Sequence, residues 1–310
     1  MNTSSALDPQ SPQAHVIGGV GVISTIIFVL IFVIVTGAIV YALFRFRGRD
    51  GEPDPKQVAD NRKVEIIWTT IPFLIVVFLF GLTIHAMNLA DPPPPPLPDL
   101  IVTGHQFWWQ ANYPASGVVI ANEIHIPAGK PLSVRLDSKD VLHEFWVPKL
   151  NRKLTTVPGQ NNHLWLQADK PGEYLGTCSE FCGMQHAWMR IVVVAEEPAK
   201  FEQWQQAQLQ PSQTPKSDAA VKGRALFQTS TCINCHAIRG VTGADAGVAP
   251  DLTHVASRKQ LGAGILENTS ANMRLWLKSP QHIKPGALMP DFTLTDEQLD
   301  QLAEYLSSLR

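Results

Sequence analysis

The sequence predicts a multi-domain protein: a transmembrane α-helical hairpin, then a β-sandwich, then a small all-α domain. Three observations predict this order. Two long apolar runs lie near the amino terminus, short β-forming segments separated by turn signals follow, and helical patterns take over after Ser217. The predicted parts are an amino-terminal tail, the hairpin, a proline-rich linker, the sandwich, a second linker and the helical domain, at residues 1–15, 16–90, 91–99, 100–196, 197–216 and 217–310.

The hairpin rests on two uncharged runs, Val16–Phe44 and Ile66–Leu89. Each is at least as long as the roughly 20 residues needed to cross a bilayer. A cleavable signal peptide fits the first run poorly, because the preceding segment carries Asp8 but no Lys or Arg, and the run is too long. The chain is therefore expected to be anchored in a lipid bilayer.

The connecting loop between the two runs sets the expected orientation. It carries six basic residues between Arg45 and Lys63, whereas the amino-terminal tail carries none. Because basic loops stay on the cytoplasmic side, both termini and the soluble part are expected on the periplasmic side or its equivalent.

The segment Asp91–Pro98 is a proline run that cannot continue a helix and predicts a stiff polyproline II spacer. Short strands then recur between turn signals such as Pro158-Gly159, which argues for an antiparallel sandwich. The predicted strands are Leu100–Thr103, Gly117–Ile126, Leu132–Asp137, His163–Gln167, Gly172–Gly176 and Met189–Ala195.

The last part of the chain has helical patterns. Gln203–Gln213 predicts a short helix followed by a linker, and three further helices are expected at Asp218–Gln228, Thr269–Lys278 and Thr295–Leu309. Thr295 and Gln298 have the spacing of a capping box.

Bulk composition excludes some functions. The net charge of -2 excludes a general polyanion binder, so no nucleic acid partner is expected. Four cysteines in 310 residues are too few for a disulfide scaffold. They form two close pairs, each with a histidine nearby, which favours metal or haem chemistry over the alternative of two disulfides.

The first pair lies in the segment Cys178–Met189, which offers two thiols, His186 and a thioether. Two thiolates suit two copper ions, because each sulfur can bridge both metals. Each copper then needs one further strong ligand, so a second histidine must come from elsewhere. Zinc is the main competitor, but Met189 is a soft ligand that favours copper.

Four histidines could supply that ligand. His143 is best placed, in a loop just before a strand, while His125 and His163 alternate with apolar residues like ordinary sheet residues. His105 precedes an aromatic cluster and is expected to be a packing or interface residue.

The second pair forms Cys232-Ile-Asn-Cys235-His236, a complete covalent haem attachment signature. Both thiols would add to the haem vinyl groups, and His236 would be the proximal iron ligand. The surrounding segments from Ser217 to Arg310 resemble a class I cytochrome c domain. That resemblance implies Met289 as the sixth ligand, with Met273 and His254 as the rivals.

Residues 16–196 resemble subunit II of a haem–copper cytochrome c oxidase. The matching stretches are Val64-Glu-Ile-Ile-Trp-Thr69, Gly104-His-Gln106, Asp140-Val-Leu-His143 and Cys178-Ser-Glu-Phe-Cys-Gly-Met-Gln-His186. The resemblance implies a cupredoxin-like Greek-key fold that holds a dinuclear copper-A centre. Its implied ligands are His143, Cys178, Cys182, His186, Met189 and the backbone carbonyl of Glu180.

Further roles follow from the same resemblance. It implies that the Glu180 side chain reaches a magnesium ion at the interface with subunit I; the alternative is a solvated loop acid. It also places Glu65 at the mouth of a proton path, where the alternative is an interfacial charge balancing nearby basic residues. The family's electron-accepting tryptophan is replaced by Phe107, but Trp108 and Trp109 keep an aromatic patch.

The sequence thus predicts subunit II of a proton-pumping cytochrome c oxidase in a bacterial inner membrane. Electrons would pass from an external donor, such as a soluble cytochrome c or a quinol-oxidising complex, to haem c, then to copper-A and to haem in subunit I. Oxygen reduction would occur on subunit I, and subunit III is a further expected partner. The alternative is a membrane-tethered electron shuttle serving another reductase, and a copper chaperone would have no use for haem.

Overall fold

A computed structural model describes residues 4–48, 51, 60–241 and 248–310. The chain divides into two compact units, one formed by His15–Pro92 and the other by Met1–Ala14 together with Pro93–Arg310. Two of the loop residues used to predict orientation, Arg49 and Lys56, lie outside the described residues.

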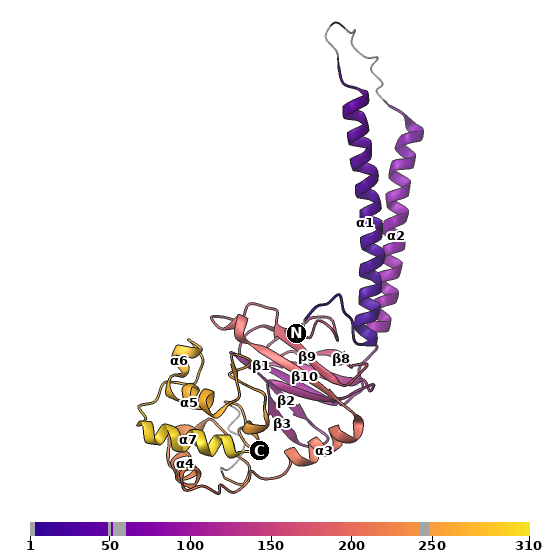
Figure 1. The fold of residues 1–310 in the computed structure, drawn as a ribbon. Helices are drawn as coiled ribbons and strands as arrows, with labels where there is room; N and C mark the ends of the chain where they lie inside the picture. Colours follow the sequence, from indigo (N-terminus) through magenta and orange to yellow (C-terminus); the bar gives the residue numbers. More distant parts are fainter. Residues whose placement is uncertain (1–3, 49–50, 52–59, 242–247) are drawn as a thin grey trace. The chain divides into compact units, whose positions relative to one another are not determined.

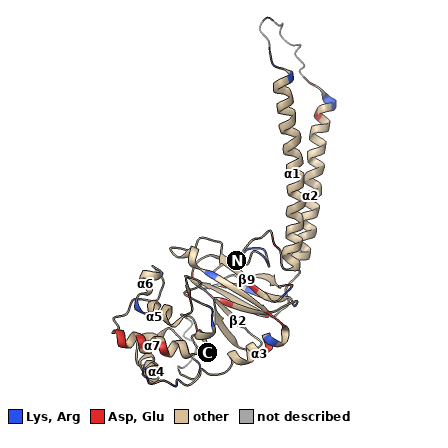
Figure 2. Cartoon of the chain, in the orientation of Figure 1, with Lys and Arg blue, Asp and Glu red and all other residues tan. Residues whose placement is uncertain are grey.

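The first unit is a helical hairpin of α1 (Pro12–Arg45) and α2 (Arg62–Ala90), as Figure 1 shows. Both helices are long and apolar enough to cross a membrane. Charged side chains occur only near the ends that face the connecting loop (Figure 2). Asn61 caps α2 by accepting the Val64 amide at 3.3 Å, and Glu65 accepts the Asn61 amide at 3.3 Å. Glu65 thus has a capping role of its own.

The second unit contains the predicted β-sandwich. Its first sheet has the strand order β3-β2-β1-β5-β8. The strands are β1 Leu100–His105, β2 Trp108–Tyr113, β3 Val118–Ala121, β5 Leu132–Ser138 and β8 Asn162–Leu166. The second sheet has the order β4-β10-β9-β6-β7. Its strands are β4 Glu123–Pro127, β6 His143–Trp146, β7 Leu154–Thr156, β9 Gly172–Cys178 and β10 Arg190–Glu196.

The sheets are mixed rather than purely antiparallel. β1 pairs with β5 in parallel, and β4 pairs with β10 in parallel, while the other neighbouring strands are antiparallel. The expectation of an antiparallel sandwich was wrong at these two pairs, because long connections bring the chain back beside an earlier strand. The apolar faces of both sheets form one core, with Trp109, Phe145 and Ile124 among its fully buried side chains.

The single strand predicted at Gly117–Ile126 is two strands in different sheets, β3 and β4. Asn122 lies between them with a φ of 63°, in the left-handed region that Asn tolerates better than most residues. Its side chain also accepts the Trp109 amide at 2.9 Å. The apolar alternation continues through this kink, so the pattern alone did not reveal it.

The amino-terminal tail packs against this sandwich. The Gln10 amide donates to the Lys149 carbonyl at 2.8 Å, and the Asp169 amide donates to the Gln10 carbonyl at 2.8 Å. Lys149 also pairs with Asp8 at 2.6 Å. The residues that precede α1 are therefore part of the soluble unit.

The longest helices of the carboxy-terminal domain are α4 (Asp218–Thr229), α5 (Ser270–Lys278) and α7 (Asp296–Ser308). Each agrees with its predicted helix to within about one residue at either end. The capping box at Thr295 is present. α4 crosses α7 closely at Gly223, where a Cβ atom would lie 2.0 Å from the Gln301 carbonyl oxygen.

The structure adds elements that the sequence did not predict. α3 (Pro198–Gln208) begins before the expected Gln203 and ends earlier than Gln213, with Pro198 in its first turn. Strands β2, β6 and β7 were not predicted; β6 and β7 have only four and three residues, whereas the six-residue β2 begins in the aromatic cluster Phe107–Trp109. The helical domain also contains a two-stranded hairpin, β11 (Gln260–Leu261) and β12 (Leu266–Glu267), and a short helix, α6 (Pro280–Ile283).

Candidate functional site

The segment Cys178–Met189 lies at one end of the second sheet. Cys178 ends β9, and Met189 directly precedes β10, the antiparallel neighbour of β9. The Cys178 amide donates to the Met189 carbonyl at 3.0 Å, which closes the loop at its base. The sheet register therefore fixes both ends of the loop, and a short 3-10 turn at His186–Trp188 shapes its second half.

Soft ligand atoms converge in this loop. The sulfur of Cys178 lies 3.9 Å from that of Cys182, which lies 3.7 Å from His186 Nδ1 and 3.8 Å from Met189 Sδ. The Glu180 carbonyl oxygen lies 3.2 Å from the Cys178 sulfur. A disulfide needs a sulfur separation of about 2.05 Å, so the two thiols are free.

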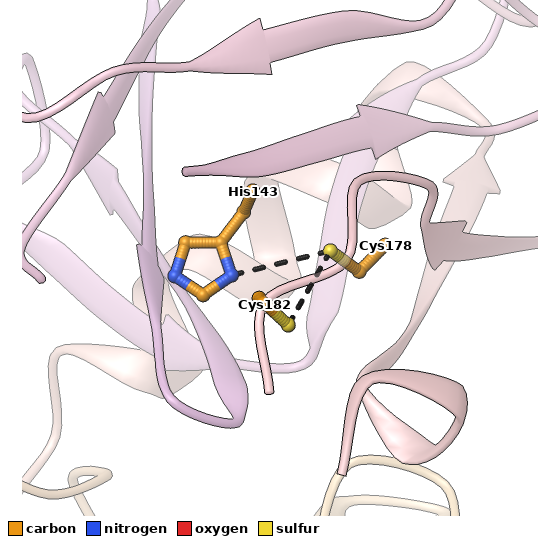
Figure 3. A group of neighbouring side chains, drawn as sticks. All are labelled: His143, Cys178 and Cys182. Carbon is orange, nitrogen blue, oxygen red and sulfur yellow. Dashed lines mark hydrogen bonds between the residues drawn. The ribbon is translucent and has the colours of Figure 1, made fainter. Parts of the chain in front are cut away.

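His143 supplies the second imidazole. It begins β6, which pairs with β9 so that Phe145 faces Cys178, and its Nδ1 lies 4.0 Å from the Cys178 sulfur. Ligand atoms of His143, Cys178 and Cys182 all lie within 4.8 Å of one another (Figure 3). The ring is fully buried and lies against Gly104, where a Cβ atom would be only 2.6 Å from His143 Cδ2.

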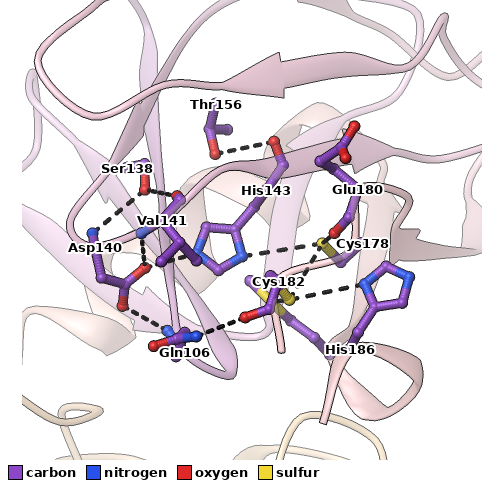
Figure 4. Close-up of polar contacts among 11 residues, drawn as sticks. Gln106, Ser138, Asp140, Val141, His143, Thr156, Cys178, Glu180, Cys182 and His186 are labelled. Carbon is purple, nitrogen blue, oxygen red and sulfur yellow. Dashed lines mark hydrogen bonds and ion pairs between the residues drawn. The ribbon is translucent and has the colours of Figure 1, made fainter. Parts of the chain in front are cut away.

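A hydrogen-bond chain holds these ligands in place (Figure 4). His143 Nε2 lies 2.8 Å from Asp140 Oδ1, while Asp140 Oδ2 accepts the Gln106 amide at 2.7 Å. The Gln106 side chain then donates to the Cys182 carbonyl at 2.5 Å. With the proton on Nε2, His143 Nδ1 presents its lone pair to the sulfur cluster.

The pKa shifts of Asp140, His143 and Cys178 follow from these contacts. Burial raises the pKa of Asp140, but hydrogen bonds from His143 and two backbone amides outweigh it and lower that pKa below its usual value. Burial lowers the pKa of His143, but its contacts with Asp140 and Cys178 outweigh it and raise that pKa. The hydrogen bond from the Cys182 thiol lowers the pKa of Cys178. The first thiolate therefore forms readily.

The donor set fits copper. It comprises two thiols, two imidazole nitrogens, one thioether and one carbonyl oxygen, and the soft thioether has no counterpart in structural zinc sites. The Glu180 side chain is exposed, and Figure 4 shows its carboxylate directed away from the cluster. Only its carbonyl takes part in the cluster.

The second cysteine pair lines a separate cavity of about 210 Å³ in the soluble unit. Cys232, Cys235, His236 and Met289 all lie on its wall, which is otherwise mostly apolar. His236 Nδ1 donates to the Pro250 carbonyl at 2.8 Å, which leaves Nε2 available for a metal. Burial lowers the pKa of His236, which favours the neutral ring that a metal needs. These residues fit a covalently held haem.

The rival axial ligands differ in their surroundings. Met289 is partly buried at the edge of the helical core, with its backbone held by a Gln281 side-chain hydrogen bond of 2.6 Å. Met273 also lines the cavity but belongs to the buried helical core. His254 is absent from the lining, and its Nε2 lies 3.1 Å from the Gln210 carbonyl.

The aromatic residues do not form an exposed patch. Phe107 and Trp108 are 6% and 9% exposed, and Trp109 is fully buried. Gln106, Phe107 and Trp108 line the same cavity as the second cysteine pair, whereas Trp109 lies in the sandwich core with its ring centroid 5.8 Å from that of His143. The Phe107 ring also approaches the cysteine loop, because a Cβ atom on Gly183 would lie 3.1 Å from it.

The other predicted histidines behave as sheet residues. His105 stacks on Trp108 with ring centroids 4.2 Å apart, and His125 stacks on Trp204 at 4.0 Å. His163 lies in β8, with Nε2 3.1 Å from the Ser133 hydroxyl. Sequence reasoning missed the roles of Asp140, Gln106 and Gly104, although the matching stretches contain all three.

Comparisons with known proteins give consistent matches. Family models match residues 5–84 as the transmembrane domain of cytochrome c oxidase subunit II, residues 116–196 as its periplasmic domain, and residues 220–310 as cytochrome c. A subunit 2 of cytochrome c oxidase from Alkalihalophilus pseudofirmus is 38% identical over 99% of this chain and 91% of its own length.

Two further matches extend this result. The subunit 2 from Bacillus subtilis is 32% identical over 99% of this chain and 92% of its own length. Among solved structures, the periplasmic domain of subunit II of cytochrome oxidase from Bradyrhizobium japonicum is 30% identical, with a TM-score of 0.35. That match covers 36% of this chain and 95% of the solved chain.

Proposed function

This chain belongs to the family of cytochrome c oxidase subunit II, carrying a cytochrome c domain, and we propose that it relays electrons through haem c to a two-copper centre. It is a component of a haem–copper oxidase, an oxidoreductase complex, and subunit I is its partner. The fold is a two-helix membrane hairpin, a cupredoxin-like domain and a helical cytochrome c domain.

One observation carries the copper part of the proposal: four ligand atoms, three from the cysteine loop and one from β6, converge around two free thiols. His143, Cys178, Cys182, His186 and Met189 would hold the metal, with the carbonyl of Glu180. Bound copper would supply reversible one-electron chemistry. The surrounding chain keeps the ligands fixed, since His143 is tied to Asp140 and the loop is tied to Gln106.

The haem part is supported by the cavity that brings together Cys232, Cys235, His236 and Met289. The two thiols would hold the group covalently and the other two side chains would face the iron. Met ligation raises the potential of a haem, which suits a donor to copper. In the proposed function, an external donor reduces haem c, and the copper centre passes electrons on to the haem of subunit I. This transfer is coupled to proton pumping by the complex.

The proposed orientation has support from the amino-terminal tail. The chain is a membrane protein with two spans. The hydrogen bonds of Gln10 to Lys149 and Asp169 of the sandwich support a placement of the residues before α1 on the same side of the membrane as the soluble domains. We place that side in the periplasm of a bacterial inner membrane, with the basic loop in the cytoplasm.

Three finer roles belong to the same proposal. The exposed Glu180 carboxylate would contribute to a magnesium site shared with subunit I. Glu65 would stand at the mouth of a proton path, in addition to capping α2. Phe107 and Trp108 would carry electrons between the cavity and the cysteine loop, and subunit III would complete the complex.

The test is spectroscopic. The complex is purified from membranes, and its optical and electron paramagnetic resonance spectra are recorded for wild type, Cys178→Ser and Cys232→Ser. We expect a mixed-valence copper signal that Cys178→Ser alone abolishes, and a covalent haem that Cys232→Ser alone disturbs. A wild-type chain with covalent haem but no such copper signal would refute the proposal. Purification without a polytopic haem subunit would instead favour the electron shuttle.

A further inference from the structure

The copper-binding and cytochrome domains of the soluble unit meet along an interface that combines an apolar cluster of Trp108, Ala121 and Ala263 with polar contacts. The Lys259 amide donates to the Glu123 carboxylate at 2.6 Å, and the Arg190 amide donates to the Ala263 carbonyl at 3.1 Å. Glu123 and Arg190 belong to the sandwich, and their partners belong to the hairpin region of the cytochrome domain. These two amides therefore report directly on whether the domains are docked.

Lys284 is the most buried charged side chain at this interface among the described residues, with 3% exposed. It ends α6 and directly precedes the segment that carries Met289. Its ammonium donates to the carbonyl oxygens of Phe107 at 2.9 Å, Trp188 at 2.8 Å and Gly262 at 2.7 Å. Burial lowers the pKa of Lys284 to about 7, and in the ammonium form all three donors have an acceptor here.

Two of those acceptors lie in the copper-binding domain, at positions that bear on both candidate sites. Trp188 directly precedes Met189, one of the proposed copper ligands. Phe107 lines the haem cavity, while its ring approaches Gly183 in the cysteine loop. Within the cytochrome domain, Lys284 reaches only Gly262. Two of the three side-chain hydrogen bonds of Lys284 therefore join the cytochrome domain to the copper-binding domain.

The chemistry of the position favours a function over simple stability. Burying an ammonium costs a large desolvation free energy, which hydrogen bonds to all of its donors only offset. An apolar residue of similar size would usually give the same stability of the fold. Charge-assisted hydrogen bonds are directional and fix the relative placement of the groups that they join. Two such bonds to separate segments of the copper-binding domain, with the third anchoring the ammonium to Gly262, define one orientation of the cytochrome domain.

We propose that Lys284 is a positioning residue that locks the cytochrome domain onto the copper-binding domain, with the haem cavity held against the Gln106–Trp108 segment. Its consequence for electron transfer rests on the proposed function above. The docking itself does not, because it follows from backbone contacts that need neither cofactor.

The test compares Lys284→Met with Lys278→Met in the purified full complex. Lys278 is an exposed lysine on α5 of the same domain, so its substitution removes a charge without touching the interface. Hydrogen exchange is measured at the Arg190 and Lys259 amides. In Lys284→Met we expect protection there to fall by about tenfold or more, as for loss of a charge-assisted hydrogen bond, while Tyr305 in α7 stays protected.

A second readout distinguishes positioning from a structural role. Flash-induced electron transfer from haem to copper is expected to slow by about tenfold or more in Lys284→Met, with unchanged haem and copper spectra, because small displacements of reacting groups carry large rate costs. If the Lys284→Met protein does not accumulate, Lys284→Gln is compared with Lys278→Met instead. The Gln side chain keeps two N–H donors but carries no charge.

Exchange at Arg190 and Lys259 equal to that of Lys278→Met would overturn the proposal. If protection at Arg190 and Lys259 is lost but the rate of electron transfer from haem to copper is unchanged, Lys284 is not a positioning residue for that transfer. Absence of a copper signal in the wild type would refute the proposed function instead, and the exchange comparison would still decide whether Lys284 holds the domains together.

Discussion

Replacing Gly104 with alanine tests how closely His143, a proposed copper ligand, is fitted to its surroundings. A Cβ atom at residue 104 would lie 2.6 Å from His143 Cδ2 and 3.0 Å from its Cγ. Carbon atoms in favourable contact are about 3.5 Å apart, so the ring would have to retreat by roughly 1 Å. The backbone at Gly104 lies outside the left-handed region, and the effect is therefore steric.

The ring has little room for such a movement. It is fully buried, its edge faces Trp109, and its Nε2 is held 2.8 Å from Asp140. We expect Gly104→Ala to destabilise the soluble unit by about 1–3 kcal/mol, as is typical for overpacking. We also expect an altered copper spectrum and a copper occupancy lower by about tenfold, because His143 Nδ1 would no longer meet the sulfur cluster.

The assay combines copper content, electron paramagnetic resonance and thermal unfolding of the purified chain. The matched control is Gly81→Ala in the membrane hairpin, where a Cβ atom would have no neighbour within 4 Å. The haem spectrum of Gly104→Ala should match that of the wild type, since the steric conflict is confined to His143. A copper spectrum and occupancy equal to those of the control would refute the reasoning.

Three further predictions concern other contacts. Asp140→Asn removes the carboxylate partner of His143, so copper affinity in a competition titration should fall about 10–100-fold; unchanged affinity would contradict this. Met289→Ala should lower the haem potential in a spectroelectrochemical titration, whereas Met273→Ala should leave the potential unchanged and cost about 2–5 kcal/mol of stability; the reverse pattern would exchange their roles. Burial raises the pKa of Glu123, so the folded state binds that proton more tightly; its contribution to stability is full at low pH and declines as the pH rises through the folded pKa. Glu123→Gln should remove this dependence in thermal unfolding as the pH rises above 4.5, the usual pKa of the group, and an identical slope would exclude Glu123 as its source.

Local signals account for most of the fold that the sequence predicted. The helix that begins after Thr295 follows from a capping box and an amphipathic pattern, both of which act over a few residues. The kink at Asn122 could not be predicted in this way, because β3 and β4 share one apolar alternation and differ only in the sheet that they join. Sheet assignment depends on pairing between distant segments, which alternation does not record.

The same distinction separates the proposed ligands that the sequence indicates clearly from the one that it does not. The cysteine loop supplies Cys178, Cys182, His186 and Met189 within one short segment, so its chemistry could be predicted from spacing alone. His143 comes from another strand. The sequence favoured it over three other histidines only because of its place in a loop just before a strand. Lys284 gave no signal, because its three acceptors are backbone carbonyls whose positions only the fold determines.

Phe107 shows what the attached cytochrome domain changes. The family that this chain resembles usually has a tryptophan at this position that receives electrons from a soluble protein. Here the side chain is 6% exposed, its ring approaches Gly183, and its carbonyl accepts a hydrogen bond from Lys284. A residue covered by a domain of its own chain has no surface left for a diffusing donor to contact. Under the proposed function, residue 107 therefore needs to pack closely between the cavity and the cysteine loop. Phenylalanine does so without an indole N–H, which in a buried tryptophan needs a hydrogen-bond partner.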